Sequence, residues 1–476
     1  MIKNYVSILL FCVTAFSFGQ VTLVKDINVG DGNSNPRNPY VFNGSIFFNA
    51  DDSSGINTGG ADLGQELWIS DGTDAGTVLV KDIRVGSSNS SPNFFFELNG
   101  VLYFSANEGS GLRIFQTDGT EAGTVSTNNT FSNLQPIVIG SKAYMTATTL
   151  GNVFYEFDGT TFQEVPDTGA GTATPLGGEY IQYDGNTIFL YMDYSTDSGT
   201  VGRELYAYDI TAQSYSLIKD VEPGTDNSGI SNFTKIGSTV YFEAESMLWQ
   251  TDGTDAGTFA VAAAMNANID NVRSFFGWFG DLYFEGDDGS GDQLWKYDPV
   301  ADTVTNLSNI SGANNNHDPG DYVSYDGWLY YSGEDATDSE PHLFRTDGTI
   351  IEQLDNTIVD VDDIVLYNDV LYFEGEDEVV DTGNELFSFD PASLSITSVG
   401  FDADIRVYPN PSTDYIKINH NLNNALNYQV IDINGRLIQE GEVVDNTINH
   451  NLDNGMYFLK IYADSKFVKT QKIIVR

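Results

Sequence analysis

The chain has 476 residues and carries 68 acidic against 21 basic side chains, which gives a formal net charge of −47 at neutral pH. Such a polyanion has no counterions to release from nucleic acid, so the charge argues against nucleic-acid binding and disfavours anionic membrane surfaces. A hydrophobic fraction of 41% and 47 glycines, without long apolar helix periods, indicate a packed all-β protein rather than a disordered polyanion.

The first segment has the pattern of a secretory signal peptide over residues 1–19. Lys3 precedes an apolar run over residues 6–18, and we expect cleavage between Gly19 and Gln20. The run is too short to cross a membrane, and no other apolar stretch approaches the roughly 20 residues needed, so we expect no transmembrane segment. The single cysteine, Cys12, lies in this segment, so the mature chain is expected to leave the cytoplasm and to fold without disulfides.

An orphan strand follows at the start of the mature chain. Residues 23–30 match residues 79–86, which follow the first complete hairpin, so the chain begins with a strand that ordinarily ends a repeat. In a ring, such a strand can pair with the last repeat and join the two termini, which removes exposed strand edges. The last repeat also has a candidate final strand of its own at Ser395–Val399, so eight blades and seven blades both remain open.

The stretch Glu66–Thr77, with the sequence ELWISDGTDAGT, recurs along the chain. Its Asp-Gly-Thr-x-Ala-Gly-Thr loop is intact at 71–77, 118–124 and 252–258. The aromatic residue three positions before the aspartate recurs at intervals of 40 to 51 residues, as Trp68, Phe115, Tyr155, Tyr206, Trp249, Trp295, Phe344 and Phe387. A period near 45 with several strands per repeat is typical of a β-propeller.

The residues of one repeat explain why it needs neighbours. Leu67 and Trp68 are adjacent on a strand and point to opposite faces of the sheet, so both faces must be covered. A second motif, a turn followed by an apolar strand as in Asn43–Phe48, occurs once before each hairpin. The two motifs together predict an all-β, eight-bladed (alternatively seven-bladed) β-propeller over residues 20–401.

The motif also carries a resemblance to a known family. Glu66-Leu67-Trp68-x-x-Asp71-Gly72-Thr73 matches the signature of the bacterial ELWxxDGT repeat proteins, and Leu248–Thr254 keeps all of it except the glutamate. The chain from about residue 21 to residue 400 resembles these proteins of Bacteroidetes. The resemblance implies an exported β-propeller-like array and brings no assigned activity.

The tail, residues 402–476, has a different composition. From Ala403 onward it contains eight basic and eight acidic residues, so the negative charge of the chain lies before it. Short alternating runs predict a small Ig-like β-sandwich. The expected strands are Ile405–Tyr408, Tyr415–Asn419, Tyr428–Ile433, Arg436–Gln439, Tyr457–Tyr462 and Phe467–Val475.

Four motifs in the tail resemble the type A sorting domain of the type IX secretion system of Bacteroidetes. The first motif is Val407–Ser412, which contains Pro409, Asn410 and Pro411. The second is Val430–Arg436, which contains Gly435. The third is Gly455–Ile461, which begins with Gly455, and the fourth is Lys472–Val475. The resemblance implies contact with the type IX secretion machinery and delivery to the medium or outer surface of a Gram-negative bacterium. An ordinary adhesive sandwich without an export role is the alternative.

No catalytic motif stands out. The chain lacks Gly-x-Ser-x-Gly, a phosphate-binding glycine loop and His-Glu-x-x-His, and carboxylate pairs are expected by chance in so acidic a sequence. The arginines are scattered over different repeats, whereas a sialidase-like site needs them clustered. His317 and His342 lie in acidic loop sequence and we expect both at the surface, and we assign no role to His420 and His450 in the tail.

Calcium is the one cofactor that the acidic composition indicates, because calcium takes six to eight oxygen ligands and carboxylates supply them. Asp287, Asp288 and Asp292 supply three carboxylates in a loop with flexible glycines, although their spacing is not that of an EF-hand. Solvated turns are the alternative interpretation of this loop.

The sequence therefore predicts an exported, non-enzymatic binding or adhesion protein, with an extracellular glycan or surface polysaccharide as the candidate partner. The alternative is a polysaccharide-acting hydrolase or lyase on a propeller scaffold, and a third possibility is a structural surface-layer component. Carboxylates and arginines that converge in a central cavity would favour catalysis, whereas aromatic side chains on one rim would favour glycan binding.

Overall fold

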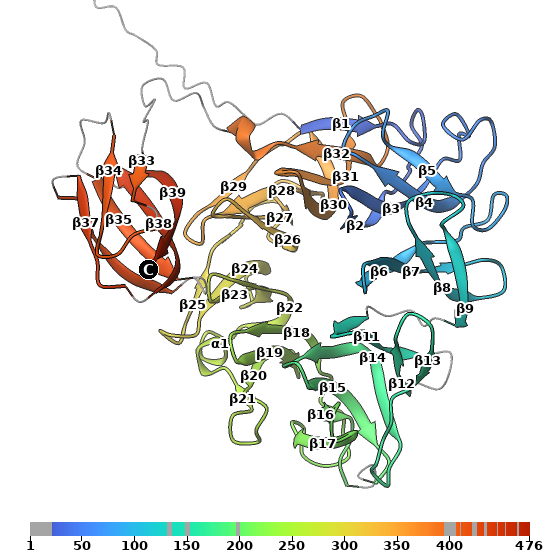
Figure 1. The fold of residues 1–476 in the computed structure, drawn as a ribbon, viewed down its shortest axis with the longest axis horizontal. Coiled ribbons are helices and arrows are strands. Elements are labelled where there is room, and N and C mark those ends of the chain that lie inside the picture. Colours follow the sequence, from blue (N-terminus) through green and yellow to red (C-terminus); the bar gives the residue numbers. More distant parts are fainter. Residues whose placement is uncertain are drawn as a thin grey trace, which may run out of the picture.

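The computed structural model describes residues 21–130, 136–147, 153–196, 200–394, 406–409, 411–420, 426–432, 436–444, 446–452, 454–463 and 466–476. The described chain is nearly all-β, as predicted. Its part between Val21 and Phe389 forms eight four-stranded antiparallel sheets. The sheets are arranged around a common centre in a β-propeller-like way (Figure 1).

Seven of these sheets consist of four consecutive strands. The first four contain β2 (Arg37–Phe42), β3 (Ser45–Asp51), β4 (Gln65–Ser70) and β5 (Val78–Lys81); β6 (Asn93–Leu98), β7 (Val101–Asn107), β8 (Leu112–Thr117) and β9 (Val125–Thr130); β10 (Ile137–Ile139), β11 (Lys142–Ala147), β12 (Val153–Phe157) and β13 (Phe162–Glu164); and β14 (Ala173–Gln182), β15 (Thr187–Tyr194), β16 (Glu204–Asp209) and β17 (Ser214–Lys219).

The next three contain β18 (Ser231–Ile236), β19 (Thr239–Ala244), β20 (Met247–Thr251) and β21 (Phe259–Ala260); β22 (Asp270–Trp278), β23 (Asp281–Asp287), β24 (Asp292–Asp298) and β25 (Thr303–Asn306); and β26 (Gly320–Tyr325), β27 (Trp328–Glu334), β28 (Pro341–Thr346) and β29 (Ile351–Gln353). A short helix, α1 (Ala262–Asn266), follows β21, and the 3-10 helix η2 (Pro391–Leu394) follows the last sheet.

The eighth sheet, here called the closing sheet, combines the two ends of the repeat region. It contains β30 (Ile358–Tyr367), β31 (Val370–Asp377), β32 (Glu385–Phe389) and β1 (Val21–Lys25). β1 lies antiparallel to β32, with Val21 opposite Phe389. The prediction that the orphan strand pairs with the last repeat is confirmed, whereas the candidate strand Ser395–Val399 lies outside the described residues.

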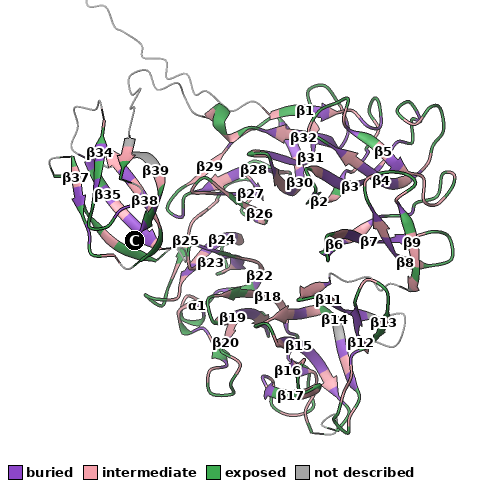
Figure 2. Cartoon of the chain, in the orientation of Figure 1, coloured by how far each residue is buried: buried purple, intermediate pink, exposed green. Residues whose placement is uncertain are grey.

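The repeated Leu-aromatic pair lies between two layers, as predicted. Leu67 and Trp68 are both almost fully buried. Leu67 belongs to an apolar cluster with Phe95 and Phe104 of the next sheet, and Trp68 to one with Tyr367 and other residues of the closing sheet. Figure 2 shows the result: buried residues follow the strands, and exposed residues lie mainly in the loops.

The repeated Asp-Gly-Thr loop satisfies its own polar atoms. Asp71 Oδ1 accepts hydrogen bonds from the backbone N and from Oγ1 of Thr73, at 3.0 and 2.6 Å, and Thr77 Oγ1 donates to the Thr73 carbonyl at 2.7 Å. A Cβ on Gly76 would lie 2.0 Å from Asp71 Oδ1, which explains the glycine. The same contacts recur at 118–124 and 252–258, so the motif is a structural turn.

The glutamate of the same motif has a role that the sequence analysis missed. Glu66 is fully buried, and its carboxylate accepts hydrogen bonds from the backbone N of Ile83 at 2.8 Å and from N and Oγ of Ser90 at 3.2 and 2.6 Å. A buried carboxylate needs such donors, and these come from the loop that leads to the next sheet. Glu204 and Glu385 occupy the same position before a Leu-aromatic pair, and we call the three residues the clamp glutamates.

Glu385 places this contact at the closure of the ring of sheets. Its carboxylate accepts hydrogen bonds from the backbone N of Ile27 and Asn28, at 2.7 and 3.0 Å, and from Ser34 Oγ at 2.7 Å. The sequence signal for the clamp is a segment Lys-Asp-(Ile/Val) with a serine seven residues after the aliphatic residue. This segment occurs at 25–34, 81–90 and 219–228, once for each clamp glutamate.

The tail forms two sheets around one apolar core that includes Ile416, Val430, Leu459 and Ile473. One sheet contains β33 (Arg406–Tyr408), β34 (Tyr415–Asn419) and β37 (Thr447–Asn449); the other contains β36 (Leu437–Glu442), β35 (Leu426–Asp432), β38 (Gly455–Ala463) and β39 (Lys466–Val475). The six predicted strands are present with shifts of one to three residues at several ends, and β37 is additional. In the described chain, no helix has both the length and the apolar character that crossing a membrane requires.

Candidate functional site

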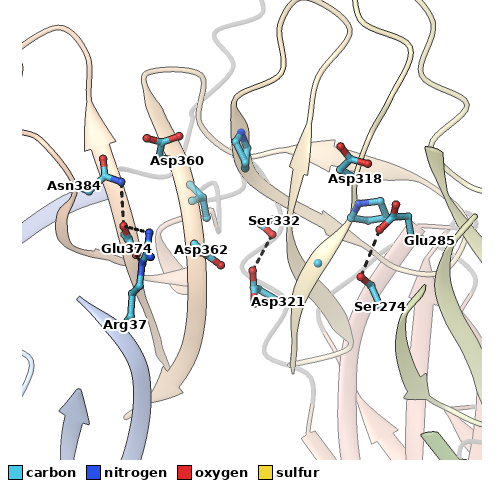
Figure 3. Close-up of a pocket in the computed structure, with 14 residues that line it drawn as sticks. Arg37, Ser274, Glu285, Asp318, Asp321, Ser332, Asp360, Asp362, Glu374 and Asn384 are labelled. Atoms are coloured by element: carbon cyan, nitrogen blue, oxygen red, sulfur yellow. Dashed lines mark hydrogen bonds and ion pairs between the residues drawn. The ribbon is translucent and has the colours of Figure 1, made fainter. Parts of the chain in front are cut away.

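A cavity of about 370 Å³ lies among the β22–β25 sheet, the β26–β29 sheet and the closing sheet (Figure 3). Its lining is strongly acidic, and Arg37 of β2 is the basic residue in it. The carboxylates that line it are Glu285, Asp318, Asp321, Asp360, Asp362 and Glu374. They come from β23, β26, the loop before it, β30 and β31, so segments far apart in the sequence share one site.

Irregular inner strands bring these side chains to the cavity. The pairing of β30 with β31 shifts register on both sides of Asp362, and the pairing of β26 with β27 shifts between Gly320 and Val323. Asp321 and Asp360 have φ values of 49° and 52°, a left-handed conformation that aspartate tolerates better than most residues. Bulges of this kind re-aim side chains, which explains why the acidic residues of these strands gather at the centre.

Arg37 is held inside the site by a carboxylate. Its Nε lies 3.0 Å from Glu374 Oε2 and its Nη2 lies 3.4 Å from Glu374 Oε1, which also accepts a hydrogen bond from Asn384 Nδ2 at 3.0 Å. Burial raises the pKa of Glu374, and the contacts with Arg37 and Asn384 oppose the shift. Asp362 and Asp363 have carboxylate oxygens within 4.8 Å of Glu374, but Arg37 already supplies the cation there.

Arg273 also pairs with carboxylates, next to the cavity on the side of the β22–β25 sheet. Its guanidinium contacts Glu285 and lies 3.3 Å from both Asp292 Oδ2 and Asp318 Oδ1. These three carboxylates have oxygens within 4.8 Å of one another, as a metal site requires. Because the guanidinium lies among them, the group does not fit a metal ion. Burial raises the pKa of Glu285 to about 7, and Arg273 opposes the shift.

Asp321 and Asp362 lie on neighbouring inner strands, and the structure couples them. The enclosed position of Asp321 raises its pKa, and the adjacent Asp362 carboxylate raises it further, while a hydrogen bond from Ser332 Oγ at 3.2 Å opposes the shift. Asp321 is accessible from the cavity, so water there moderates the effect. The pair can hold a proton at a pH where an isolated aspartate cannot.

The residues predicted to bind calcium are not brought together. Asp287 Oδ1 accepts hydrogen bonds from the backbone N of Gly289 and Gly291, at 2.7 and 2.9 Å, and Asp288 Oδ1 accepts one from Ser290 Oγ at 2.6 Å. In the described residues Asp292 is grouped with Glu285 and Asp318 instead. The geometry therefore supports the alternative of solvated turns, and calcium binding by this loop stays a prediction.

The expectation that His317 and His342 lie at the surface is wrong, because both are buried. His317 Nδ1 lies 2.5 Å from the Glu334 carbonyl and its Nε2 lies 3.1 Å from Tyr331 Oη, and burial lowers its pKa to about 4. Acidic sequence around a histidine suggests a solvated loop, but here the inter-sheet packing covers both side chains. His450 of the tail is also buried and lies 2.5 Å from Ser412 Oγ.

The remaining predicted positions fall in several places. Gly19, Gln20, Asn410 and Gly435 lie outside the described residues. Pro409, Pro411 and Gly455 are exposed at the ends of tail strands or next to them. Between Val21 and Phe389, the described aromatic side chains among the exposed large hydrophobic residues are Phe259 and Phe279, which belong to different sheets. These two side chains do not form an aromatic rim, and the aromatic residues that line a described pocket, Phe233, Phe275, Phe276 and Tyr322, are half-buried.

A comparison with known families identifies the tail. Residues 406–476 match the family described as the secretion system C-terminal sorting domain. The chain therefore carries a type IX secretion sorting domain, which points to export to the outer surface or the extracellular space and to contact with the type IX machinery. No curated protein sequence matches the chain.

Several solved structures are similar in outline. The chain is 13% identical to PorZ, a surface component of the type IX secretion system of Porphyromonas gingivalis, with 91% of this chain and 64% of that chain covered and a TM-score of 0.38. The propeller domain of the trilobed protease from Pyrococcus furiosus is 14% identical, with 71% and 100% covered and a TM-score of 0.39. An oligogalacturonate lyase from Vibrio parahaemolyticus is 11% identical, with 75% and 98% covered and a TM-score of 0.43. Likeness at this level carries no argument about activity.

Proposed function

We propose that this chain is an exported, non-enzymatic binding protein, built as an eight-bladed β-propeller followed by a small Ig-like sorting sandwich. The cavity inside the ring of sheets is the binding site, and its ligand is a cationic, hydroxyl-rich molecule such as an oligosaccharide of glucosamine. The observation that carries this proposal is the gathering of six carboxylates around one cavity.

The charge balance of the cavity selects a cation. Arg37 and Arg273 are already paired with Glu374 and Glu285. Among the described residues, no lysine or arginine forms an ion pair with Asp321, Asp360 or Asp362. Carboxylates of one sign in a walled cavity focus their field toward its centre, so they attract cations and repel polyanions such as uronic acid polymers.

A polysaccharide-acting hydrolase or lyase is the second candidate function. Carboxylates and Arg37 line the cavity, and Arg273 contacts two of the lining carboxylates, Glu285 and Asp318, which approaches the arrangement expected of a catalytic site. Asp321, with its raised pKa, could act as an acid beside the Asp362 carboxylate. Against this, both arginines are held by carboxylates of the protein itself, which leaves them poorly placed to bind an anionic substrate.

The binding experiment compares three oligosaccharide classes on one column format. Immobilised glucosamine oligomers are cationic, N-acetylglucosamine oligomers share their backbone without the charge, and galacturonic acid oligomers are anionic. We expect the purified chain to be retained by the first class, with retention that falls as salt rises. Equal retention on all three classes, or preference for the anionic one, would contradict the proposal. Shortening of any oligosaccharide during the incubation would favour the enzyme instead.

The export route has its own test. In a bacterium with type IX machinery, a variant that lacks residues 402–476 is expected to remain in the periplasm, while the full chain reaches the surface or medium. Immunoblots of periplasm and medium measure this, and a periplasmic marker protein controls for lysis. Undiminished appearance of the shortened chain in the medium would show that the tail is not the export signal.

A further inference from the structure

A third group of metal-ligand atoms lies away from the acidic cavity, at the loop between β27 and β28. It consists of Asp335, Asp338 and His342, whose ligand atoms lie within 4.8 Å of one another. Asp338 is half-exposed, Asp335 is partly buried, and the side chain of His342 is only 4% exposed. Clustered carboxylates alone are common on so acidic a chain, so the histidine decides what the group can do.

His342 directs an unpaired nitrogen at the two carboxylates. Its Nδ1 lies 3.0 Å from the Ile358 carbonyl of the closing sheet, so this nitrogen carries the proton and donates it to the backbone. Nε2 then has a lone pair, is buried, and has no hydrogen-bond partner. Metal-binding histidines typically donate the other ring N–H to a carbonyl or carboxylate in this way, which fixes both the tautomer and the direction of the ring.

The distances suit an ion between the three side chains better than direct contact. Nε2 lies 3.9 Å from Asp335 Oδ2 and 3.6 Å from Asp338 Oδ1, too far for hydrogen bonds. A tetrahedral ion with ligands at about 2.0–2.1 Å separates its ligand atoms by about 3.3–3.4 Å, so the two distances from Nε2 would shorten by about 0.2–0.6 Å on binding. The oxygens of the two carboxylates lie within 4.8 Å of each other. Hydrogen bonds from the backbone N and Oγ1 of Thr337 hold the other oxygen of Asp335.

The two groups near the cavity provide the contrast. Arg273 lies among the carboxylates of one, and Arg37 pairs with Glu374 in the other. Within the described ranges, no lysine or arginine lies at ion-pair distance from Asp335 or Asp338. The charge of this group is therefore left for a cation from solution.

We propose that Asp335, Asp338 and His342 bind a divalent transition-metal ion, with Zn²⁺ as the best match, and leave one position for water. One nitrogen and two carboxylate oxygens suit zinc, whereas calcium and magnesium prefer oxygen ligands only. Because His342 also contacts the Ile358 carbonyl, the ion would tie the β27–β28 loop to the closing sheet. This site is independent of the cationic ligand proposed for the cavity.

The test uses the full chain, stripped of metal by a chelator and then dialysed against Zn²⁺. We expect about one Zn²⁺ per chain by elemental analysis, and a visible absorption of tetrahedral type when Co²⁺ replaces Zn²⁺. His342→Gln and Asp338→Asn are expected to weaken Zn²⁺ binding at least about tenfold. Asp292→Asn, in the group that Arg273 fills, is the matched control and is expected to leave it unchanged.

Asp338→Asn keeps the test decisive, because Asp338 is half-exposed and its replacement is compatible with folding even if the buried His342 is not replaceable. Equal Zn²⁺ retention by the wild type, Asp338→Asn and Asp292→Asn would mean adventitious binding to surface carboxylates and would overturn the proposal. Absence of Zn²⁺ from the wild type would overturn it as well. Displacement of Zn²⁺ by equimolar Ca²⁺ would overturn the assignment to a transition metal.

Discussion

The residue directly before the Leu-aromatic pair makes different hydrogen bonds in different sheets. In three sheets it holds a clamp glutamate, whose carboxylate accepts hydrogen bonds from the loop that leads to the next sheet. In the β26–β29 sheet it holds His342, whose Nδ1–H meets a backbone carbonyl instead. The backbone beside this position explains the choice of residue, because N–H groups of a loop need an acceptor, whereas the Ile358 carbonyl at the start of β30 needs a donor.

The β22–β25 sheet lies between these two cases. Gln293 occupies the same position, and its Oε1 accepts a hydrogen bond from the Ile310 backbone N at 2.7 Å while its Nε2 donates to the Asn315 carbonyl at 2.7 Å. The residue at this position of the repeat is thus an acceptor, a donor or both, according to the backbone groups that lie beside it.

Removal of the clamp at the closure should have the largest effect. Glu385→Ala leaves the buried N–H groups of Ile27 and Asn28 and the Ser34 hydroxyl without their acceptor, so we expect a loss of about 3–5 kcal/mol in the free energy of unfolding. Urea unfolding followed by fluorescence measures it, with Glu97→Ala, an exposed glutamate on β6, as the control. Equal stability of the two variants would show that the clamp does not hold the termini.

Replacement of the histidine at this position by the glutamate of the clamp sheets should have the next largest effect on stability. His342→Glu removes the donor to the Ile358 carbonyl and places a third carboxylate beside Asp335 and Asp338, so we expect a loss of about 1–3 kcal/mol. Thermal unfolding in the presence of a chelator separates this from any effect of metal. A neutral or stabilising result would mean that the position accepts either residue, whatever backbone group lies beside it.

The clamp glutamates should also make stability depend on pH. Burial raises the pKa of Glu66 and Glu204 to about 7 and that of Glu385 to about 8, while the hydrogen bonds that they accept oppose the shift. Because the folded chain holds protons that the unfolded chain releases, stability is fully present below the unfolded pKa and falls as pH rises toward about 8.

The expected result is a Tm that falls by a few degrees between pH 5 and pH 8, measured by calorimetry at constant ionic strength. Glu204→Gln removes one titrating carboxyl, so its Tm should change less over the same interval. A Tm that rises with pH over this interval would show that the clamp carboxylates are ionised throughout, held by their hydrogen-bond donors.

The surface contacts between sheets should have the smallest effect. Lys25 Nζ lies 2.8 Å from Asp74 Oδ1 of the next sheet, but the Asp74 side chain is 75% exposed. Exposed ion pairs contribute little, so Lys25→Met should lower stability by less than about 1 kcal/mol. Lys219→Met, which removes the equivalent pair with Asp255, is a matched variant. A loss above about 2 kcal/mol in either would place the link between sheets at the surface rather than at the clamps.

Much of the fold could be predicted because the sequence of each repeat shows which strand faces must be buried. Leu67 and Trp68 are apolar on both faces of one strand, and the match between residues 23–30 and 79–86 indicated how the ring of sheets closes. The cavity could not be predicted, because bulges in β26 and β30 decide which acidic residues turn inward. His342 was missed for a related reason: its burial depends on the adjacent sheet, which local sequence does not report.

Calorimetric titration with a glucosamine hexasaccharide measures whether the cavity carboxylates bind a cationic ligand. We expect one binding site per chain in the wild type and in Asp288→Asn, which removes an exposed carboxylate outside the cavity. We expect at least about tenfold weaker binding in the double variant Asp360→Asn/Asp362→Asn, because two charge contacts are lost. Equal affinity in all three proteins, or no binding in the wild type, would contradict the proposed role of the cavity carboxylates.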